Sequence, residues 1–396
     1  MIVDATVVDA TPVPMGTLPC EAPQYWPLSL RSAHHPAIVH YRAAAEEPTA
    51  RAVLGYLDHA WDVEVGELGF RPPLDDGGAC GPDGGFDVFL WGGIEECYVD
   101  VIGEDASTAW DDRTSYLVVD PWGPYGGAIL DTTVAHELNH AMQAADDWSD
   151  SAVVYEMTAV FVEDLVYGDD NEYVHQIVDF QAHPDWSLDH DDKYETWYMY
   201  GSALYLRFVR DHYVGGDAAW IGAMWKRLRS PYDSGEPDFE DALDAILKAK
   251  GVGFVDSVAE FARWRVYTGA RDDGKHFREG ASFAEPARAA TAHTTGATIA
   301  IAVMALGSAY VDVAPSDGAP TSATVELQDA SSAVRWVVDV VPGANSDGDR
   351  LDLSHGPVRI DVSRPRTIVV TALPEGENDP DTRSAAHHHA TLVIAP

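Results

Sequence analysis

The spacing of apolar positions changes twice along this chain, and each change predicts a different kind of structure. In the first third, short alternating or β-branched runs predict strands, and these lie at residues 37–41, 86–91 and 115–120. Residues 49–68 place Val53, Leu57 and Ala60 at intervals of three and four, which is the spacing of one helix face. The 36 residues at the start contain six prolines and little periodicity, so we expect an irregular arm there.

From about residue 131 to residue 270 the pattern is helical. Successive segments carry apolar residues at helical spacing, and several of them end at a glycine. We expect helices near residues 131–145, 151–166, 194–213, 217–229, 238–249 and 254–268.

After about residue 290, short β-rich runs alternate with Gly, Pro, Asp and Ser. The predicted strands are residues 298–303, 309–313, 323–327, 334–341, 358–362, 367–371 and 391–394. Strands at such spacing are typical of an antiparallel sandwich. The predicted fold class is therefore α+β: an arm (1–36), a domain with a small mixed sheet and helices (37–289), and an all-β sandwich domain (290–396).

The net charge of the chain limits which classes of molecule are expected as its main partner. The chain has 65 acidic and 25 basic residues, a formal charge of −40, while 46% of its residues are hydrophobic. The apolar content indicates a folded protein, and the negative charge disfavours nucleic acid or an anionic membrane surface as the main partner. No segment has the roughly 20 apolar residues of a membrane span. We expect a monomer.

Three cysteines, Cys20, Cys80 and Cys97, are too few for a disulfide scaffold. Cys80 and Cys97 bracket one predicted strand and could pair, and the alternative is three unpaired thiols. The first residues lack the basic and apolar regions of a signal peptide as written, so the protein is either cytosolic or its leader is missing from this sequence.

The strongest chemical signal is His136-Glu-Leu-Asn-His140, an HExxH motif on a predicted helix. Positions i and i+4 share one helix face, so both imidazoles can reach one cation. Glu137 lies one position further round the helix, where it can act as a general base rather than as a ligand. The alternative is a pair of surface histidines beside a solvated glutamate.

A catalytic zinc needs a third protein ligand and an open position for water. The metzincin pattern is absent, because Gln143 and Asp146 stand where that pattern has Gly and His. Glu156 is the better candidate, since it borders the apolar stripe of the next predicted helix and a carboxylate there needs a partner. Glu163, two turns further along, is expected to support a ligand or to be an alternative one.

These motifs resemble the gluzincin metallopeptidases, and more closely a bacterial, largely myxobacterial, family of secreted metalloproteases. The similarity extends over about residues 38–285 and includes the segments AWDVEVGELGF at 60–70, AHELNHAMQ at 135–143, EDLVY at 163–167 and YGS at 200–202. It implies a zincin-like fold and a zinc site at His136, Glu137, His140 and Glu156. The chain departs from the family at Met157, where Gly is usual.

Two further expectations concern catalysis and calcium. Hydrolysis of a peptide needs a donor to the oxyanion, and the similarity implies Tyr198, with Tyr200 as the second choice. Acidic runs at residues 169–172 and 189–192 and a turn at 345–349 could hold Ca²⁺, although solvated loops explain them equally well.

Together, these observations predict a zinc-dependent metallopeptidase, extracellular or at the cell surface, with Glu137 as general base. An endopeptidase is favoured over an exopeptidase because no GxMEN-like segment precedes the HExxH motif. The alternative from another class is a non-catalytic surface or adhesion protein, in which the zincin scaffold is degenerate and the β-sandwich binds a partner.

Overall fold

The computed structural model describes residues 13–14, 17–232, 234–293, 296–315, 320–343, 348–375, 379–380 and 383–396. Its internal contacts divide the chain into two compact units. Unit 1 comprises Met1–Asp150, Ala159–Glu172 and Ala219–Asp238, and unit 2 comprises Ser151–Thr158, Tyr173–Ala218 and Phe239–Pro396. Helices and sheets occur in both, so the predicted α+β class is confirmed.

Unit 1 is built on a five-stranded sheet with the order β1-β2-β3-β5-β4. Its strands are β1 (Leu28–Arg31), β2 (Ala37–Tyr41), β3 (Phe86–Leu90), β4 (Cys97–Glu104) and β5 (Arg113–Val119). The three central strands are parallel, and β1 and β4 run antiparallel at the two edges. The strands predicted at 37–41, 86–91 and 115–120 are therefore the buried centre of the sheet, where sequences are apolar on both faces.

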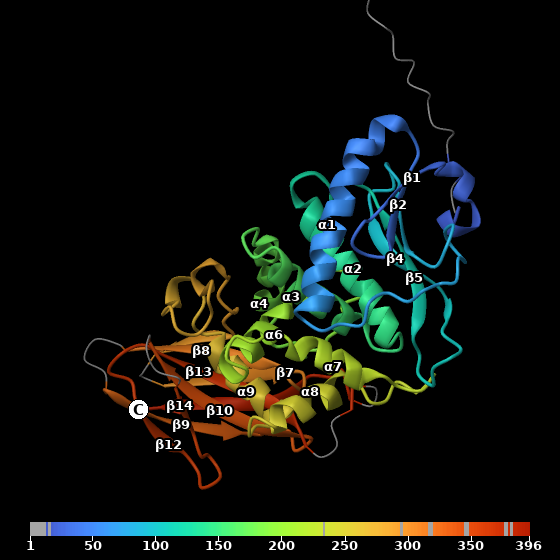
Figure 1. Ribbon diagram of the computed structural model, residues 1–396. Helices are drawn as coiled ribbons and strands as arrows, with labels where there is room; N and C mark the ends of the chain where they lie inside the picture. The colour runs from blue at the N-terminus through green and yellow to red at the C-terminus, as the bar shows by residue number, and fades with distance from the viewer. Residues whose placement is uncertain are drawn as a thin grey trace, which may run out of the picture. The chain divides into compact units, whose positions relative to one another are not determined.

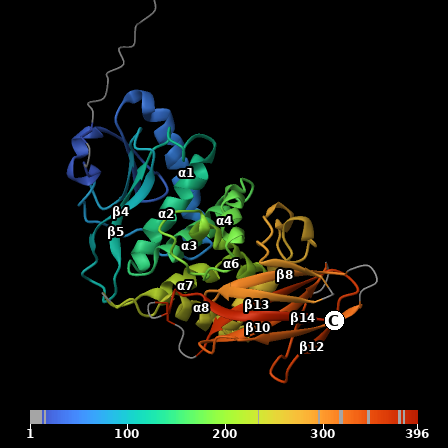
Figure 2. The same ribbon diagram turned by 180° about the vertical axis from the view of Figure 1, so that it is seen from behind.

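Helices cover one face of this sheet, as Figures 1 and 2 show. They are α1 (Glu47–Gly66) and α2 (Leu130–Asp146), and α7 (Trp220–Leu228) packs against α2. Helix α3 (Ala152–Val166) is continuous and contributes its second half to unit 1. The predicted helices at 49–68, 131–145, 151–166 and 217–229 are thus present.

The N-terminal arm covers the other face of the sheet and is less irregular than predicted. Residues 28–31 form β1, which pairs with β2. Trp26 is buried with Phe89, Tyr116 and Val118, and its indole N–H donates to the Leu90 carbonyl. Burial of Trp26 against the strands therefore anchors the arm, although the proline-rich sequence of the arm has no periodicity of its own.

The disulfide prediction was wrong. Cys80 pairs with Cys20, and Cys97 is a free thiol. Cys20 lies in the 3-10 helix η1 (Pro19–Glu21), and the arm places it beside the glycine-rich loop that contains Cys80. Proximity along the sequence favoured Cys97, but tertiary contacts of the arm determine the pair.

Unit 2 contains further helices and two sheets. Its helices are α4 (Ile177–Ala182), α5 (Tyr198–Gly201), α6 (Ala203–Phe208), the π-helical turn η6 (Val209–Tyr213), α8 (Phe239–Lys248) and α9 (Phe254–Trp264). The helix predicted at 194–213 starts only at Tyr198, because Lys193 and Tyr194 are left-handed and Asp192 accepts the N–H of Thr196. Within the described residues, no helix is both long and apolar enough to cross a bilayer.

The two sheets of unit 2 have the strand orders β11-β10-β13-β8-β6 and β12-β9-β14-β7. The strands are β6 (Ala290–His293), β7 (Ala297–Val303), β8 (Ser308–Ala314), β9 (Ser322–Gln328), β10 (Val334–Pro342), β11 (Asp349–Arg350), β12 (Val358–Asp361), β13 (Arg366–Pro374) and β14 (His388–Ala395). All seven predicted strands are present. Side chains from both sheets share one apolar core, which includes Val311, Val325, Ile368 and Leu392.

Unit 2 also contains helices that precede residue 290. Helix α9 packs on β13 and β10, where Ala262, Val266 and Tyr267 form a second cluster with Tyr310, Val341 and Val369. The change in sequence pattern at residue 290 marks a change of secondary structure, but the core continues across it.

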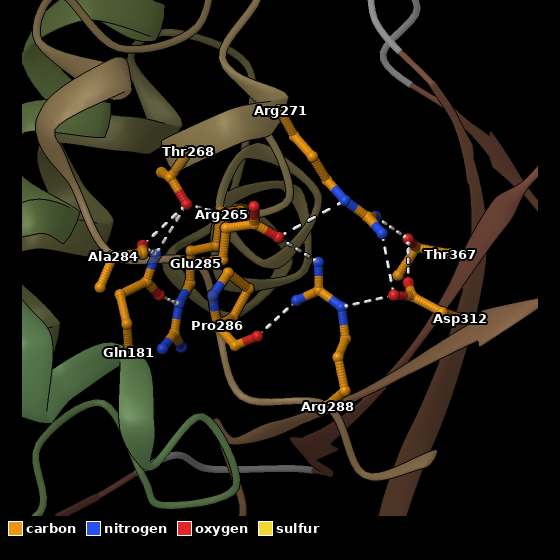
Figure 3. A network of polar contacts seen from close by, with 10 residues as sticks. All are labelled: Gln181, Arg265, Thr268, Arg271, Ala284, Glu285, Pro286, Arg288, Asp312 and Thr367. Carbon is orange, nitrogen blue, oxygen red and sulfur yellow. Dashed lines mark hydrogen bonds and ion pairs between the residues drawn. The ribbon is translucent and has the colours of Figure 1, made fainter. Parts of the chain in front are cut away.

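A polar network ties the segment after α9 to the strands of unit 2 (Figure 3). Asp312 on β8 accepts hydrogen bonds from Arg271 Nη2 at 2.8 Å, Arg288 Nε at 3.1 Å and Thr367 Oγ1 at 2.7 Å. Burial raises the pKa of Asp312, but the Thr367 hydrogen bond and the charges of Arg288 and Arg271 outweigh it, so the net pKa is lowered.

We therefore expect Asp312→Ala to lower the free energy of unfolding by about 1–3 kcal/mol, because two guanidinium groups lose a charged acceptor. The folded pKa is depressed, so the stabilisation is present above the unfolded value of about 3.9 and is lost as the pH falls below it. Urea unfolding at pH 7 and pH 3 measures both effects, with Asp349→Ala on the exposed strand β11 as control. An equal unfolding midpoint for Asp312→Ala and wild type at pH 7 would contradict this role.

Candidate metal centre

Helix α2 brings His136 and His140 together on one face. Their Nε2 atoms lie 3.1 Å apart, and the two rings meet edge to face with centroids 4.7 Å apart. The i, i+4 spacing of the HExxH motif accounts for this arrangement. The predicted juxtaposition of two imidazoles is therefore present in the folded chain.

The second ring nitrogen of each imidazole, Nδ1, lies within hydrogen-bond distance of a side-chain oxygen. His136 Nδ1 lies 3.0 Å from Glu163 Oε2, and His140 Nδ1 lies 2.7 Å from Gln143 Oε1. Both partners can accept, so the neutral imidazole that suits each contact has its proton on Nδ1 and its lone pair on Nε2. Burial raises the pKa of Glu163, and the hydrogen bond from His136 opposes that rise.

Glu156 completes a group of three potential ligands. One atom from each of His136, His140 and Glu156 lies within 4.8 Å of the others. Glu156 precedes Glu163 by two turns on the continuous helix α3, so both carboxylates lie on one side of that helix. This group, in which Glu156 is buried and both histidines are partly buried, could hold a metal ion, and Glu163 contacts His136, in the supporting position that the sequence suggested.

The donor set fits zinc better than calcium or magnesium. Two imidazole nitrogens and one carboxylate oxygen leave a position open in a tetrahedral site, whereas calcium takes six to eight oxygens. With Zn–N distances of about 2.0–2.1 Å, a tetrahedral ion separates two nitrogen ligands by about 3.3 Å, close to the spacing of the Nε2 atoms. Two facing lone pairs repel each other, and a cation between them removes that repulsion.

Glu137 is buried on the same helix, with 8% of its surface exposed. Its charge acts on the free thiol of Cys97, which lies on β4. Burial raises the pKa of Cys97 to about 12, and the charge of Glu137 adds to that rise. The carboxylate of Glu137 thus acts electrostatically on strand β4, which packs against α2.

We expect Cys97 to react slowly with alkylating reagents in the folded protein. The thiolate is the reactive species, so a raised pKa should slow the reaction at least about tenfold relative to the unfolded chain. Mass spectrometry after iodoacetamide treatment, with and without denaturant, measures this. Labelling at equal rates in both states would show that Cys97 is neither buried nor close to a carboxylate.

The two candidate tyrosines differ in their surroundings. Tyr198 is fully buried, burial raises its pKa, and its hydroxyl donates to the Ser187 carbonyl at 2.8 Å. Tyr200 is half-buried and packs edge to face on Trp197. Gly201, which follows it, lies so close to the Gln176 carbonyl that a Cβ would meet it at 2.5 Å. Helix packing therefore explains this glycine, and Tyr200 is the more accessible donor.

The calcium predictions find no support in the described part of the chain. Neither acidic run, 169–172 or 189–192, belongs to a group of three potential ligand atoms there. Asp191 and Asp192 accept backbone N–H groups of their own turn. Residues 345–347 of the predicted turn lie outside the described residues.

Neither a scan against protein-family models nor a search of curated proteins finds a match for this chain. The expected similarity to gluzincins therefore rests on the sequence motifs alone.

The sequence did not reveal the buried residues that are linked to His140 by successive hydrogen bonds. Gln143 Nε2 donates to Asn139 Oδ1 at 2.8 Å, and Asn139 Nδ2 donates to Glu64 Oε2 at 2.9 Å. The signal was present in the sequence, because Glu64 continues the apolar stripe of Leu57 and Ala60 at spacing seven and four. A carboxylate at such a position is buried and needs a polar partner.

Proposed function

We propose that this protein is a zinc-dependent metallopeptidase in which His136, His140 and Glu156 bind the metal and Glu137 is the general base. The observation that carries the proposal is the pair of imidazole Nε2 atoms 3.1 Å apart, with a carboxylate in the same group. Each imidazole is oriented by an acceptor on its Nδ1, as in metal sites whose ligands are held by a further layer of hydrogen bonds.

Zinc bound there would supply Lewis-acid activation of water and of the scissile carbonyl. Glu137, next to His136 on α2 and largely excluded from solvent, takes the proton from the attacking water and returns it to the leaving amine. Tyr200 is our candidate for the donor to the oxyanion, since the hydroxyl of Tyr198 is engaged with a backbone carbonyl.

Strand β4 supports a peptide as substrate. It is the last strand of its sheet, and its outer edge has no strand partner among the residues described. An extended peptide can add to such an edge through main-chain hydrogen bonds without a fixed side-chain sequence. Cys97 on β4 neighbours Glu137, so a peptide bound along this strand would run beside the general base.

The finer description of the fold belongs to the same proposal. The sheet of unit 1 with α1 and α2 is consistent with a zincin-like domain. The two sheets after residue 290, with their common core, are consistent with a β-sandwich. Secretion and an extracellular or cell-surface location remain part of the proposal.

The ligand set is testable by X-ray absorption at the zinc edge on the purified protein. We expect one zinc per chain, two imidazole ligands, a carboxylate oxygen and no sulfur. Sulfur in the coordination sphere would point to Cys97 instead. A protein that binds no zinc after dialysis against a zinc-containing buffer would overturn the proposal.

A further inference from the structure

A line of hydrogen bonds leads from His140 into the core between α1 and α2. It consists of Glu64, Asn139, Gln143 and His140, here called the Glu64 network. The successive donor–acceptor distances are 2.9, 2.8 and 2.7 Å, counted from Glu64 outward. Glu64 lies on α1, and the other three lie on α2, where Asn139 and Gln143 are one turn apart.

Which residue donates and which accepts in each hydrogen bond of the network depends on the group at its buried end, Glu64. Glu64 Oε2 accepts, so Asn139 turns its Nδ2 toward Glu64 and its Oδ1 toward Gln143. Gln143 then turns Nε2 inward and Oε1 toward His140, which leaves His140 Nδ1 as the donor. An amide in the place of Glu64 could donate instead, and each amide of the network could then turn round.

Reversal would change the ligand. With Gln143 donating to Nδ1, the imidazole of His140 would carry its proton on Nε2, which is the atom that faces His136. A protonated Nε2 cannot bind a metal. The identity of the group on α1 therefore bears on whether His140 is a ligand.

Burial makes this arrangement specific. Glu64, Asn139 and Gln143 have no exposed surface, so water does not compete for their hydrogen bonds. Glu64 Oε1 has no hydrogen-bond partner among the described residues, and burial raises the pKa of this carboxyl well above its usual range. A carboxyl group is costly at this position of an apolar stripe, where an aliphatic side chain would pack without that cost.

We propose that Glu64 is a positioning residue that acts through Asn139 and Gln143 to keep His140 in the Nδ1–H tautomer, with Nε2 available for the metal. This inference rests on the metal site of the proposed function, and it adds a residue 72 positions before the motif to that site. A purely structural role, in which the network only joins α1 to α2, would leave the tautomer and the metal affinity unchanged.

Two variants separate these roles. Glu64→Gln keeps size and shape but can donate, and the double variant Glu64→Leu, Asn139→Leu replaces both ends of one hydrogen bond with apolar groups of similar volume, which proteins tolerate well. We expect the zinc dissociation constant of each to rise at least about tenfold, the lower end for loss of a group that orients a ligand. Glu67→Gln, at the exposed C-cap of α1, is the matched control and should bind zinc like wild type.

The tautomer is measured directly by nitrogen NMR of metal-free protein with ¹⁵N-labelled histidine, His140 being assigned with a His140→Ala variant. Wild type should show the Nδ1–H form at His140, and Glu64→Gln should show a population of the Nε2–H form. The inference is overturned by an Nε2–H form in wild type, or by variants that bind zinc as tightly as wild type. If wild type binds no zinc the proposed function fails, and the NMR result still decides the inference.

Discussion

Replacing Glu137 by Gln is expected to lower the rate of peptide cleavage by at least about a hundredfold while leaving zinc bound. General acid–base catalysis typically contributes a factor of about 10²–10⁴, and an amide cannot accept the proton of water at neutral pH. Zinc should remain because Glu137 is not among the three grouped ligands. Cleavage of casein and zinc content, measured on the same samples, give both quantities.

Glu67→Gln is the control for this prediction as well, since it makes the same chemical change at the exposed C-cap of α1. It should leave both cleavage and zinc content unchanged. Near-normal cleavage by Glu137→Gln would remove this residue from the mechanism. Loss of zinc from Glu137→Gln would instead make Glu137 a ligand, and Glu156 would then need a different role.

Removing both imidazoles is expected to abolish zinc binding at this site. Zinc affinity should fall at least about a hundredfold in the double variant His136→Ala, His140→Ala. Each ligand, and each group that hydrogen-bonds to a ligand, contributes a factor of ten or more. Glu156→Ala should weaken binding by at least about tenfold. Competition with a chromophoric chelator measures the affinities.

Glu163→Ala provides the comparison within this series. Glu163 contacts His136 Nδ1 and lies on the same helix as Glu156, so its loss should weaken zinc binding about tenfold through a freer His136 ring. If Glu163→Ala lost more affinity than Glu156→Ala, the carboxylate ligand would be Glu163. Full zinc content in the double histidine variant would place the metal elsewhere in the protein.

The sequence was sufficient for features that depend on local spacing. The HExxH motif predicts its own geometry, because four residues make about one helical turn whatever surrounds them. Buried strands such as β3 and β5 and the strands after residue 290 were recognisable from β-branched runs bounded by turn residues. Glu156 was recognisable because a carboxylate at the edge of an apolar stripe needs a partner.

Features that depend on contacts distant in sequence could not be predicted in the same way. The edge strand β4 has a mixture of polar and apolar residues, and only its pairing with β5 defines it as a strand. Cys20 forms a disulfide with Cys80 because the arm folds over the sheet. The link between Glu64 and Asn139 joins two helices 75 residues apart along the chain, so no local pattern reveals which partner the buried carboxyl has.

The most direct test of the central claim is a zinc titration of the metal-free protein with peptide cleavage as the readout. We predict that activity is absent without metal, rises in proportion to added zinc and reaches a plateau at one zinc per chain. The same titration of Glu137→Gln should bind one zinc and show almost no cleavage. Wild-type protein that binds one zinc at this site and cleaves no peptide would contradict the account and favour a binding protein built on the same scaffold.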